Sequence, residues 1–368
     1  MEGPRGLRGE EFPSLSRLMD TVFVGRPEGV MFSRYPQLFN VHNLANLLVF
    51  TDGGEVVSHA GMLLRWATLG GCTVRAGLVG AVGTREDRRG QGLASRLLEA
   101  ACHKARENGA DFMLISGRRG LYRRYGAAEV GMGHTAHIHR EHAKQLALQE
   151  VRLRPFEEHR LDACAGAYQQ KPDSFLRPWD DWEYFLTSRH CMNEPAEIIC
   201  IFERDVFAGY FVLAKDRGGG QGRILEYAGC LGAIASALGA LFDYARLKEV
   251  EFFLESGSHR LGKLLVQAGC VLRAEPYEGT LLLLNFPQLM ERLRPLFETR
   301  IGQERSRGMR FTQDGERFVF GVPGQERTIT GRRAAAEFLF GNPHVMRPEG
   351  VLSRLFPVPT LWYGLNYI

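Results

Sequence analysis

Residues 79–95 read VGAVGTREDRRGQGLAS, and this stretch decides the fold class. A strand is predicted to end in its first half, a basic turn with glycines follows, and a helix is predicted to begin near Gly92. Unpaired backbone N–H groups and the partial positive charge of a helix N-terminus make such a turn a binding site for a diphosphate. Gly90 and Gly92 let the backbone approach the phosphates, and Arg88 and Arg89 add charge-assisted contacts.

The flanking residues predict a mixed α/β fold around this turn. Asp52-Gly53-Gly54 and Gly70-Gly71 are hairpin signals that join three antiparallel strands. A Rossmann dinucleotide site fits less well, because its glycine-rich turn would follow a parallel strand with no meander before it. The predicted elements, in chain order, are a helix at 11–23, strands at 47–51, 56–66 and 73–82, a helix at 93–105 and a buried strand at 112–116.

A second unit repeats this order of elements, which predicts a structural duplication. A third segment begins near Asn285, with Thr330 as the expected N-cap of its last helix. For the second unit the elements are strands at 151–154, 198–202, 207–213, 224–227 and 250–254, helices at 161–168 and 234–246, and a flexible turn at 217–222. For the third they are helices at 286–297 and 330–340 and strands at 309–311 and 318–322.

Composition and charge exclude several classes of protein. The 368 residues include 46 basic and 42 acidic side chains, a net charge of +4, and this balance argues against a nucleic-acid-binding protein. The seven cysteines lie in or beside apolar runs without metal-ligand spacing, so we expect buried reduced thiols. No signal peptide or 18-residue apolar span is present, which predicts a cytoplasmic protein with no membrane partner. His137 and His139 share a strand face, but no further ligand has matching spacing, so we expect no metal.

The turn also carries a family resemblance. Arg89-Gly90-Gln91-Gly92-Leu93-Ala94 resembles the R-x-x-G-x-G/A pattern of the GNAT acetyltransferase superfamily. The resemblance implies that acetyl-CoA is the co-substrate and that the preceding strand binds its pantetheine arm through backbone groups. The cofactor-binding residues that it implies are Val82, Gly83, Thr84, Arg88, Arg89, Gly90, Gln91, Gly92, Leu93, Ala94 and Ser95.

A second motif narrows the resemblance. The segment 120–126, GLYRRYG, is similar to the G-[IL]-Y-x-[RK]-[FY]-G segment of acetyltransferases of the enhanced-intracellular-survival (Eis) type. That family implies tandem GNAT folds and a sterol-carrier-protein-like α+β domain, which would divide this chain into residues 1–147, 148–284 and 285–368. Residues 229–233, GCLGA, occupy the place of the phosphate turn in the second copy and contain no arginine, so we expect no cofactor there.

The same resemblance implies two catalytic groups. Tyr122 matches the tyrosine that protonates the departing CoA thiolate, a role that a phenol near the sulfur can serve. The family also directs its C-terminal carboxylate into the site as a base, here that of Ile368, although many relatives end in an aromatic residue. The apolar end LFPVPTLWYGLNYI agrees with a docked terminus. Packing of Tyr122 in the core, catalysis by Tyr125 and docking of the terminus for stability alone stay open as alternatives.

The expected function is transfer of an acetyl group from acetyl-CoA to a primary amine on a small molecule or a lysine. The alternative is a non-catalytic acyl-CoA or lipid-binding sensor. Family resemblance also implies a homo-oligomer. Two sets of residues stay open as acceptor-site candidates: an aromatic set that could equally be core (Phe175, Trp179, Trp182, Tyr184 and Phe185) and an acidic set that could attract a cationic amine (Glu203, Asp205, Glu226 and Glu255).

Overall fold

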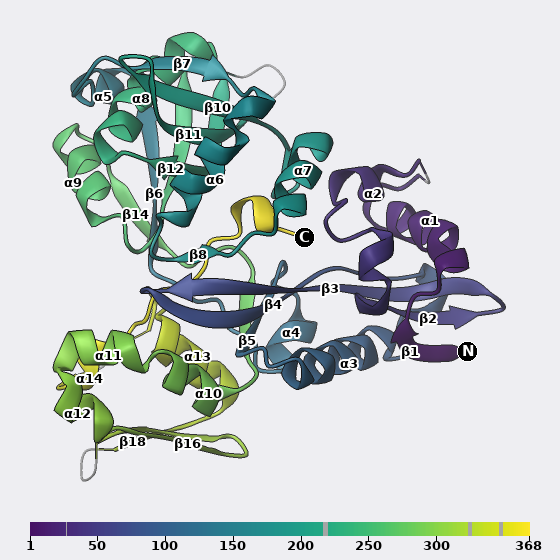
Figure 1. Cartoon of the computed structure of the whole chain (residues 1–368). Coiled ribbons are helices and arrows are strands. Elements are labelled where there is room, and N and C mark those ends of the chain that lie inside the picture. Colours follow the sequence, from purple (N-terminus) through teal and green to yellow (C-terminus); the bar gives the residue numbers. More distant parts are fainter. Residues whose placement is uncertain (27, 216–219, 323–325, 346–348) are drawn as a thin grey trace.

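The computed structural model describes residues 1–26, 28–215, 220–322, 326–345 and 349–368 (Figure 1). Within these ranges the chain is a mixed α/β protein with sheets of seven, eight and three strands. The predicted fold class is therefore confirmed. The expected turn at 217–222 lies largely outside the described residues.

The seven-stranded sheet contains the motif stretch. Its order is β1-β2-β3-β4-β5-β15, with β8 paired to β3, and every pairing is antiparallel except that of β4 with β5. Figure 1 shows α1 and α2 on one side of the long strands β3 and β4 and α3 on the other. The bounds are β1 Glu2–Gly6, α1 Phe12–Phe23, α2 Val30–Arg34, β2 Leu47–Asp52, β3 Glu55–Leu69, β4 Cys72–Thr84, α3 Leu93–Glu107, β5 Phe112–Ile115, α4 Gly120–Arg124, β8 Ser174–Phe175 and β15 Thr280–Leu283.

The eight-stranded sheet repeats this strand arrangement. Its order is β7-β10-β11-β12-β13-β6-β14, with β9 paired to β10, and β12 and β13 form its parallel pair with α8 between them in the chain. Thus four antiparallel strands, a helix and a parallel strand occur twice. The bounds are β6 Gly133–His139, α5 Arg140–Gln145, β7 Arg152–Pro155, α6 Leu161–Gln169, α7 Trp179–Ser188, β9 His190–Cys191, β10 Glu194–Glu203, β11 Val206–Lys215, β12 Gln221–Gly229, α8 Leu231–Tyr244, β13 Glu249–Leu254, α9 His259–Gln267 and β14 Leu272–Glu275.

Each large sheet contains one strand that comes from the other unit's stretch of sequence. β6 follows the first unit in sequence but lies between β13 and β14 of the second sheet. In exchange, β15 leaves the second unit and pairs with β5 of the first sheet. The predicted sequence boundary at 147/148 therefore does not coincide with a boundary between sheets.

The last segment has a small antiparallel sheet, β16-β17-β18, covered by helices. Two predictions were wrong here. The helix expected at 286–297 is two helices that meet at Leu293, because Pro295 lacks the N–H that a continuous helix needs. Thr330 ends β18, and Gly331 at φ 95° is the N-cap. The bounds are α10 Phe286–Arg292, α11 Arg294–Ile301, α12 Gln303–Arg307, β16 Arg310–Asp314, β17 Arg317–Gly321, β18 Arg327–Thr330, α13 Arg332–Phe340 and α14 Leu352–Leu355.

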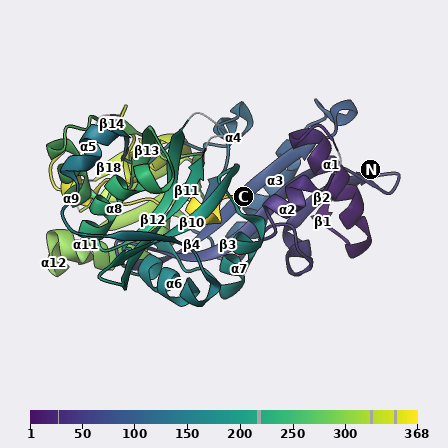
Figure 2. The same ribbon diagram turned by 90° about the horizontal axis from the view of Figure 1, so that it is seen from above.

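The C-terminal tail lies inside the molecule. In both views the chain end is near α7 and β3 (Figures 1 and 2), and Figure 1 shows the tail between the two large sheets. Residues 361–368 are all buried, and they share one apolar core with the first sheet, the second sheet and the last segment. Six of the seven cysteines are buried thiols as expected, whereas Cys230 is exposed.

β4 has a bulge at Ala81, whose φ of 49° is unusual for a residue with a side chain. The pairing of β3 with β4 shifts between His59 and Gly61 at this point. The His59 ring is fully buried, and its Nδ1 lies 2.9 Å from the Ala81 carbonyl oxygen. Because a carbonyl oxygen only accepts, Nδ1 carries the proton. Its Nε2 is buried without a hydrogen-bond partner among the described residues, and burial lowers the pKa of His59 to about 4.

We expect His59 to make stability depend on pH. Its pKa is about 6.5 in the unfolded chain and about 4 in the folded one, so the unfolded state binds more protons between these values. Stability is fully present above pH 6.5 and falls by about 3 kcal/mol as the pH drops toward 4. Chemical denaturation of wild type and His59→Asn, whose amide also reaches toward the Ala81 carbonyl, tests this. Equal pH slopes in the two proteins would contradict it.

Candidate active site

A cavity of about 570 Å³ opens between the end of β4 and the start of α3. Ten of the eleven residues that the sequence predicts as cofactor-binding line it, and Gln91 does not. Four lining residues, Val22, Arg119, Leu121 and Arg124, were not predicted. The complete lining is Val22, Val82, Gly83, Thr84, Arg88, Arg89, Gly90, Gly92, Leu93, Ala94, Ser95, Arg119, Leu121 and Arg124.

The glycines of the turn have the conformation that this site requires. Gly90 and Gly92 have φ of 79° and 75°, and a Cβ on either would meet nothing within 4 Å. Gly92 is the N-cap of α3, so the first amides of that helix lack intrahelical partners. No described residue accepts a hydrogen bond from the backbone N–H groups of residues 90–95. These amides therefore offer free donors at a helix N-terminus with a partial positive charge, an arrangement that suits an anion.

Three arginines add cationic charge without a counterion. Arg89, Arg119 and Arg124 line the cavity and form no ion pair with a carboxylate in the described ranges. Arg88 differs, because its Nη2 donates to Asp52 at 2.5 Å. Arg123, the neighbour of Arg124 in α4, is held by Glu129 at 2.7 Å and does not line the cavity. The free cations thus point to an anionic ligand, which supplies the missing negative charge.

Beside the cavity, β4 separates from β5. The parallel pairing ends at Val79 and Ile115, while β4 continues to Thr84. The Val82 carbonyl accepts a hydrogen bond from Arg119 Nη1 at 3.3 Å. Backbone groups in this part of β4 are therefore available to a ligand on the side that faced β5.

The chain terminus reaches the same opening. A Cβ placed on Gly80 would lie 2.0 Å from the Ile368 carbonyl oxygen, so only glycine permits the terminal carboxylate to lie against β4 here. Ile368 is 3% exposed. Tyr367 anchors it, because its carbonyl accepts from Gln37 Nε2 at 3.1 Å and its hydroxyl donates to the Ser116 carbonyl at 3.2 Å. The apolar tail predicted a terminus docked inside the protein, and the buried position of Ile368 confirms this.

Tyr122 lies in α4, soon after β5, and is not among the residues that line the cavity. A Cβ on Gly117 would lie 2.9 Å from its ring, so Tyr122 packs against the segment that follows β5. Its hydroxyl forms no hydrogen bond within the described part of the chain and is free to bind a ligand atom. Burial raises its pKa above the usual 10, with Arg119 opposing, so the phenol stays protonated at neutral pH. Tyr125 differs, because its hydroxyl donates to the Ser95 carbonyl at 3.1 Å.

The other sequence candidates lie elsewhere. In the aromatic set, Phe175, Trp182 and Phe185 are buried core, and Trp179 is 47% exposed. His137 pairs with Glu249 at 2.7 Å, and no group of metal-ligating side chains occurs in the residues that the structure describes. In the acidic set, Glu226 and Glu255 are buried in ion pairs with Arg177 and Lys171. Glu203 accepts from Gln149 Nε2 and Asp205 from Arg154, both on the surface of the second unit.

Comparisons with known proteins agree with this geometry. Residues 4–130 match the family model described as an acetyltransferase (GNAT) domain, whereas no curated protein matches the sequence. No helix among the described residues has the length and apolar character to cross a membrane.

Several solved structures share the fold of the whole chain. One is a conserved protein from Enterococcus faecalis V583 described as a probable N-acyltransferase, with 12% identity, a TM-score of 0.69, and 99% of this chain and 98% of that chain covered. A GCN5-related N-acetyltransferase from Kribbella flavida has 16% identity, a TM-score of 0.68 and 99% coverage of both chains. Eis1 from Mycobacterium abscessus has 15% identity, a TM-score of 0.66 and 99% coverage of both chains. The N-terminal part of this chain is thus similar to a GNAT acetyltransferase domain, and 99% of the chain shares its fold with each of the three structures.

Proposed function

We propose that the protein is an acetyl-CoA-dependent N-acetyltransferase that acetylates a primary amine by direct attack. The observation that carries this proposal is the cavity at the turn beside the gap between β4 and β5. Three unpaired arginines line this cavity, the terminal carboxylate lies against Gly80 of β4, and the protonated Tyr122 packs against Gly117, which follows β5.

The site fits the parts of acetyl-CoA in order. The amides of residues 90–95 suit the diphosphate, which needs donors rather than a single point charge. Arg89, Arg119 and Arg124 match the several negative charges of CoA. The unpaired edge of β4 beyond Val79 suits the amide-containing pantetheine arm, which can add to a strand by backbone hydrogen bonds.

The chain supplies the groups that this reaction needs. The amine nitrogen forms a bond to the thioester carbonyl carbon, and a backbone N–H near Val82 polarises the carbonyl oxygen. The C–S bond then breaks, Tyr122 donates its proton to the CoA sulfur, and the products are an acetamide and CoA. The Ile368 carboxylate accepts the proton that the attacking nitrogen loses, which balances the reaction. A water can carry that proton.

The acceptor belongs to a class of small-molecule amines or lysine side chains. We also propose that the chain is divided into two GNAT-like units and a sterol-carrier-like unit. We further propose that the protein is cytoplasmic and forms a homo-oligomer. The competing function is a non-catalytic acyl-CoA or lipid sensor. The two differ in thioester cleavage, because only the enzyme releases free CoA thiol from acetyl-CoA when a panel of amines is supplied.

Substitution of the cavity arginines is expected to weaken acetyl-CoA binding. Arg119→Gln and Arg124→Gln each remove a free cation and should raise the dissociation constant by about 10- to 100-fold, the worth of one hydrogen bond to a charged group. Isothermal titration calorimetry measures this. Arg123→Gln, in the same helix but paired with Glu129, is the matched control and should bind as wild type does. Equal binding by all three variants would refute the assignment of this cavity.

Loss of the Tyr122 hydroxyl is expected to slow the chemical step. Tyr122→Phe should lower kcat by about 100- to 10,000-fold, the usual range for a general acid, and leave acetyl-CoA affinity unchanged. Tyr125→Phe is the control, since its hydroxyl donates to the α3 backbone. Because the pKa of Tyr122 lies above 10, activity should show no loss from its deprotonation in the neutral range. If both variants turn over at the same rate, Tyr122 is a packing residue.

A further inference from the structure

Arg177 and Glu226 form an ion pair that is almost fully enclosed, with side chains 1% and 2% exposed. The pair is bidentate, with Nη1–Oε1 and Nη2–Oε2 distances of 2.9 and 2.5 Å. Burial disfavours the charged carboxylate, but the Arg177 charge outweighs this effect and holds the pKa of Glu226 below its usual range. Two full charges therefore sit in the interior of the second unit, where acetyl-CoA has no proposed role.

Both members of this pair bind the C-terminal tail. Arg177 Nε donates to the Asn366 side-chain oxygen at 2.7 Å, and the Leu365 backbone N–H donates to Glu226 Oε2 at 3.0 Å. Just before them in the chain, Gly364 has φ of 49°, and a Cβ there would lie 2.0 Å from Glu226 Oε2. The tail thus passes so close to the carboxylate that only glycine fits.

The surroundings fix the geometry of the pair. The Arg177 guanidinium lies 3.6 Å from the centre of the Tyr168 ring and 4.8 Å from that of Trp182, and the Tyr210 hydroxyl donates to Glu226 Oε1 at 2.6 Å. A buried ion pair is a poor source of net stability, because its desolvation offsets its Coulomb energy. What such a pair supplies, when every partner is hydrogen-bonded, is a unique arrangement of the groups that it joins.

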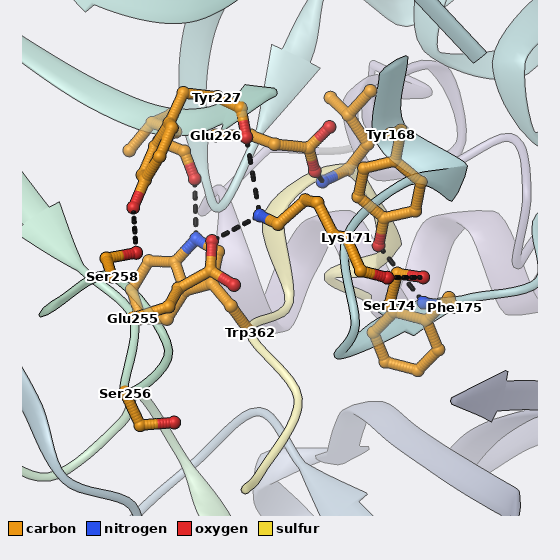
Figure 3. A network of polar contacts seen from close by, with 12 residues as sticks. Tyr168, Lys171, Ser174, Phe175, Glu226, Tyr227, Glu255, Ser256, Ser258 and Trp362 are labelled. Atoms are coloured by element: carbon orange, nitrogen blue, oxygen red, sulfur yellow. Dashed lines mark hydrogen bonds and ion pairs between the residues drawn. The ribbon is translucent and has the colours of Figure 1, made fainter. Parts of the chain in front are cut away.

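A further hydrogen bond holds the tail just before this point. Trp362 Nε1 donates to the Leu225 carbonyl at 2.6 Å. Beside it, Lys171 Nζ donates to the Tyr227 carbonyl at 3.3 Å and pairs with Glu255, so this contact fixes β12 rather than the tail itself. Figure 3 shows Trp362, Lys171 and Glu255 side by side beneath this part of β12.

These contacts lie just beyond the point where the parallel pairing of the second sheet ends. In the second sheet the parallel pairing of β12 and β13 ends at Ile224 and Phe252, as that of β4 and β5 ends at Val79 and Ile115 in the first. The tail's hydrogen bonds to β12 fall on the next two residues, at the Leu225 carbonyl and the Glu226 carboxylate. The C-terminal tail therefore lies, in the second unit, beyond the parallel pairing, at the place that corresponds to the opening in the first sheet.

We propose that Arg177 and Glu226 are positioning residues that hold the tail at this place in the second sheet and thereby place the Ile368 carboxylate against Gly80. They act through Leu365 and Asn366, the tail residues that they bind. Only Tyr367 lies between Asn366, which Arg177 binds, and the terminal residue. The short connection limits how far the Ile368 carboxylate can move while the ion pair holds the tail. The catalytic consequence rests on the proposed function, whereas the placement of the tail does not.

The test compares two double variants in the full-length protein. Arg177→Met/Glu226→Leu removes both charges, so neither is left buried and unpaired. The control, Arg65→Met/Asp181→Leu, removes another bidentate ion pair with side chains 15% and 7% exposed, which joins β3 to α7 without touching the tail. Far-ultraviolet circular dichroism and calorimetric binding of acetyl-CoA establish that both variants are folded.

The direct readout is release of Ile368 and Tyr367 by a carboxypeptidase, followed by mass spectrometry. Cleavage tracks the population of the undocked tail. Loss of one charge-assisted hydrogen bond raises that population about 10- to 100-fold, so the Arg177/Glu226 variant should be trimmed faster by that factor. Wild type and the Arg65/Asp181 control should resist equally. Equal resistance of the Arg177/Glu226 variant would overturn the proposal.

A kinetic readout separates this proposal from the proposed function. With an amine that wild type acetylates, the Arg177/Glu226 variant should lose kcat and keep its acetyl-CoA affinity, as should a variant that lacks Ile368. If removal of Ile368 leaves kcat unchanged, the carboxylate is not the base and that part of the proposed function fails. The trimming result still decides whether the ion pair holds the tail, because it needs neither an acceptor nor turnover.

Discussion

The site depends on the separation of β4 from β5 beyond Val79 and Ile115. A parallel sheet normally satisfies its backbone groups on both sides of a central strand, and an unpaired strand in the interior is costly. Here the gap receives the Ile368 carboxylate at Gly80 and Arg119 at Val82, and it leaves the rest of the β4 edge to a ligand. The Ala81 bulge and the buried His59 lie on the opposite edge of the same strand, where they fix its path.

Charge decides what the gap can accept. Several arginines near the turn have carboxylate partners: Arg85 with Asp87, Arg88 with Asp52 and Arg123 with Glu129. Those that line the cavity and stay unpaired lie around amides that also lack acceptors. Because a cluster of cations is unfavourable without negative charge nearby, the arrangement is stable only with an anion or with water and salt in its place. The selectivity of this site thus comes from which arginines are left unpaired rather than from the overall charge of +4.

Local patterns in the sequence predicted most elements and most of the cavity, because glycine φ angles and helix starts are local properties. Long-range features were not predictable in this way. β1 reads EGPRG and has no apolar alternation, and a strand pattern does not reveal to which sheet β6 or β15 belongs. Arg119 and Arg124 belong to a basic stretch, residues 118–124 (RRGLYRR). The sequence does not reveal which of its arginines pair with a carboxylate, because tertiary structure decides that. The burial of the tail was signalled by its apolar residues, but not its passage over Glu226.

The exchange of β6 and β15 and the burial of the tail have one physical consequence in common. Each unit contributes to the core of the other, so the second unit cannot move as a rigid appendage without exposing strand edges and breaking the Arg177–Glu226 contacts. The second unit, whose turn at 229–233 contains no arginine, is thus held in place by packing against the chain's own end. This packing requires glycine at position 364, because a side chain there would collide with the Glu226 carboxylate that binds the tail.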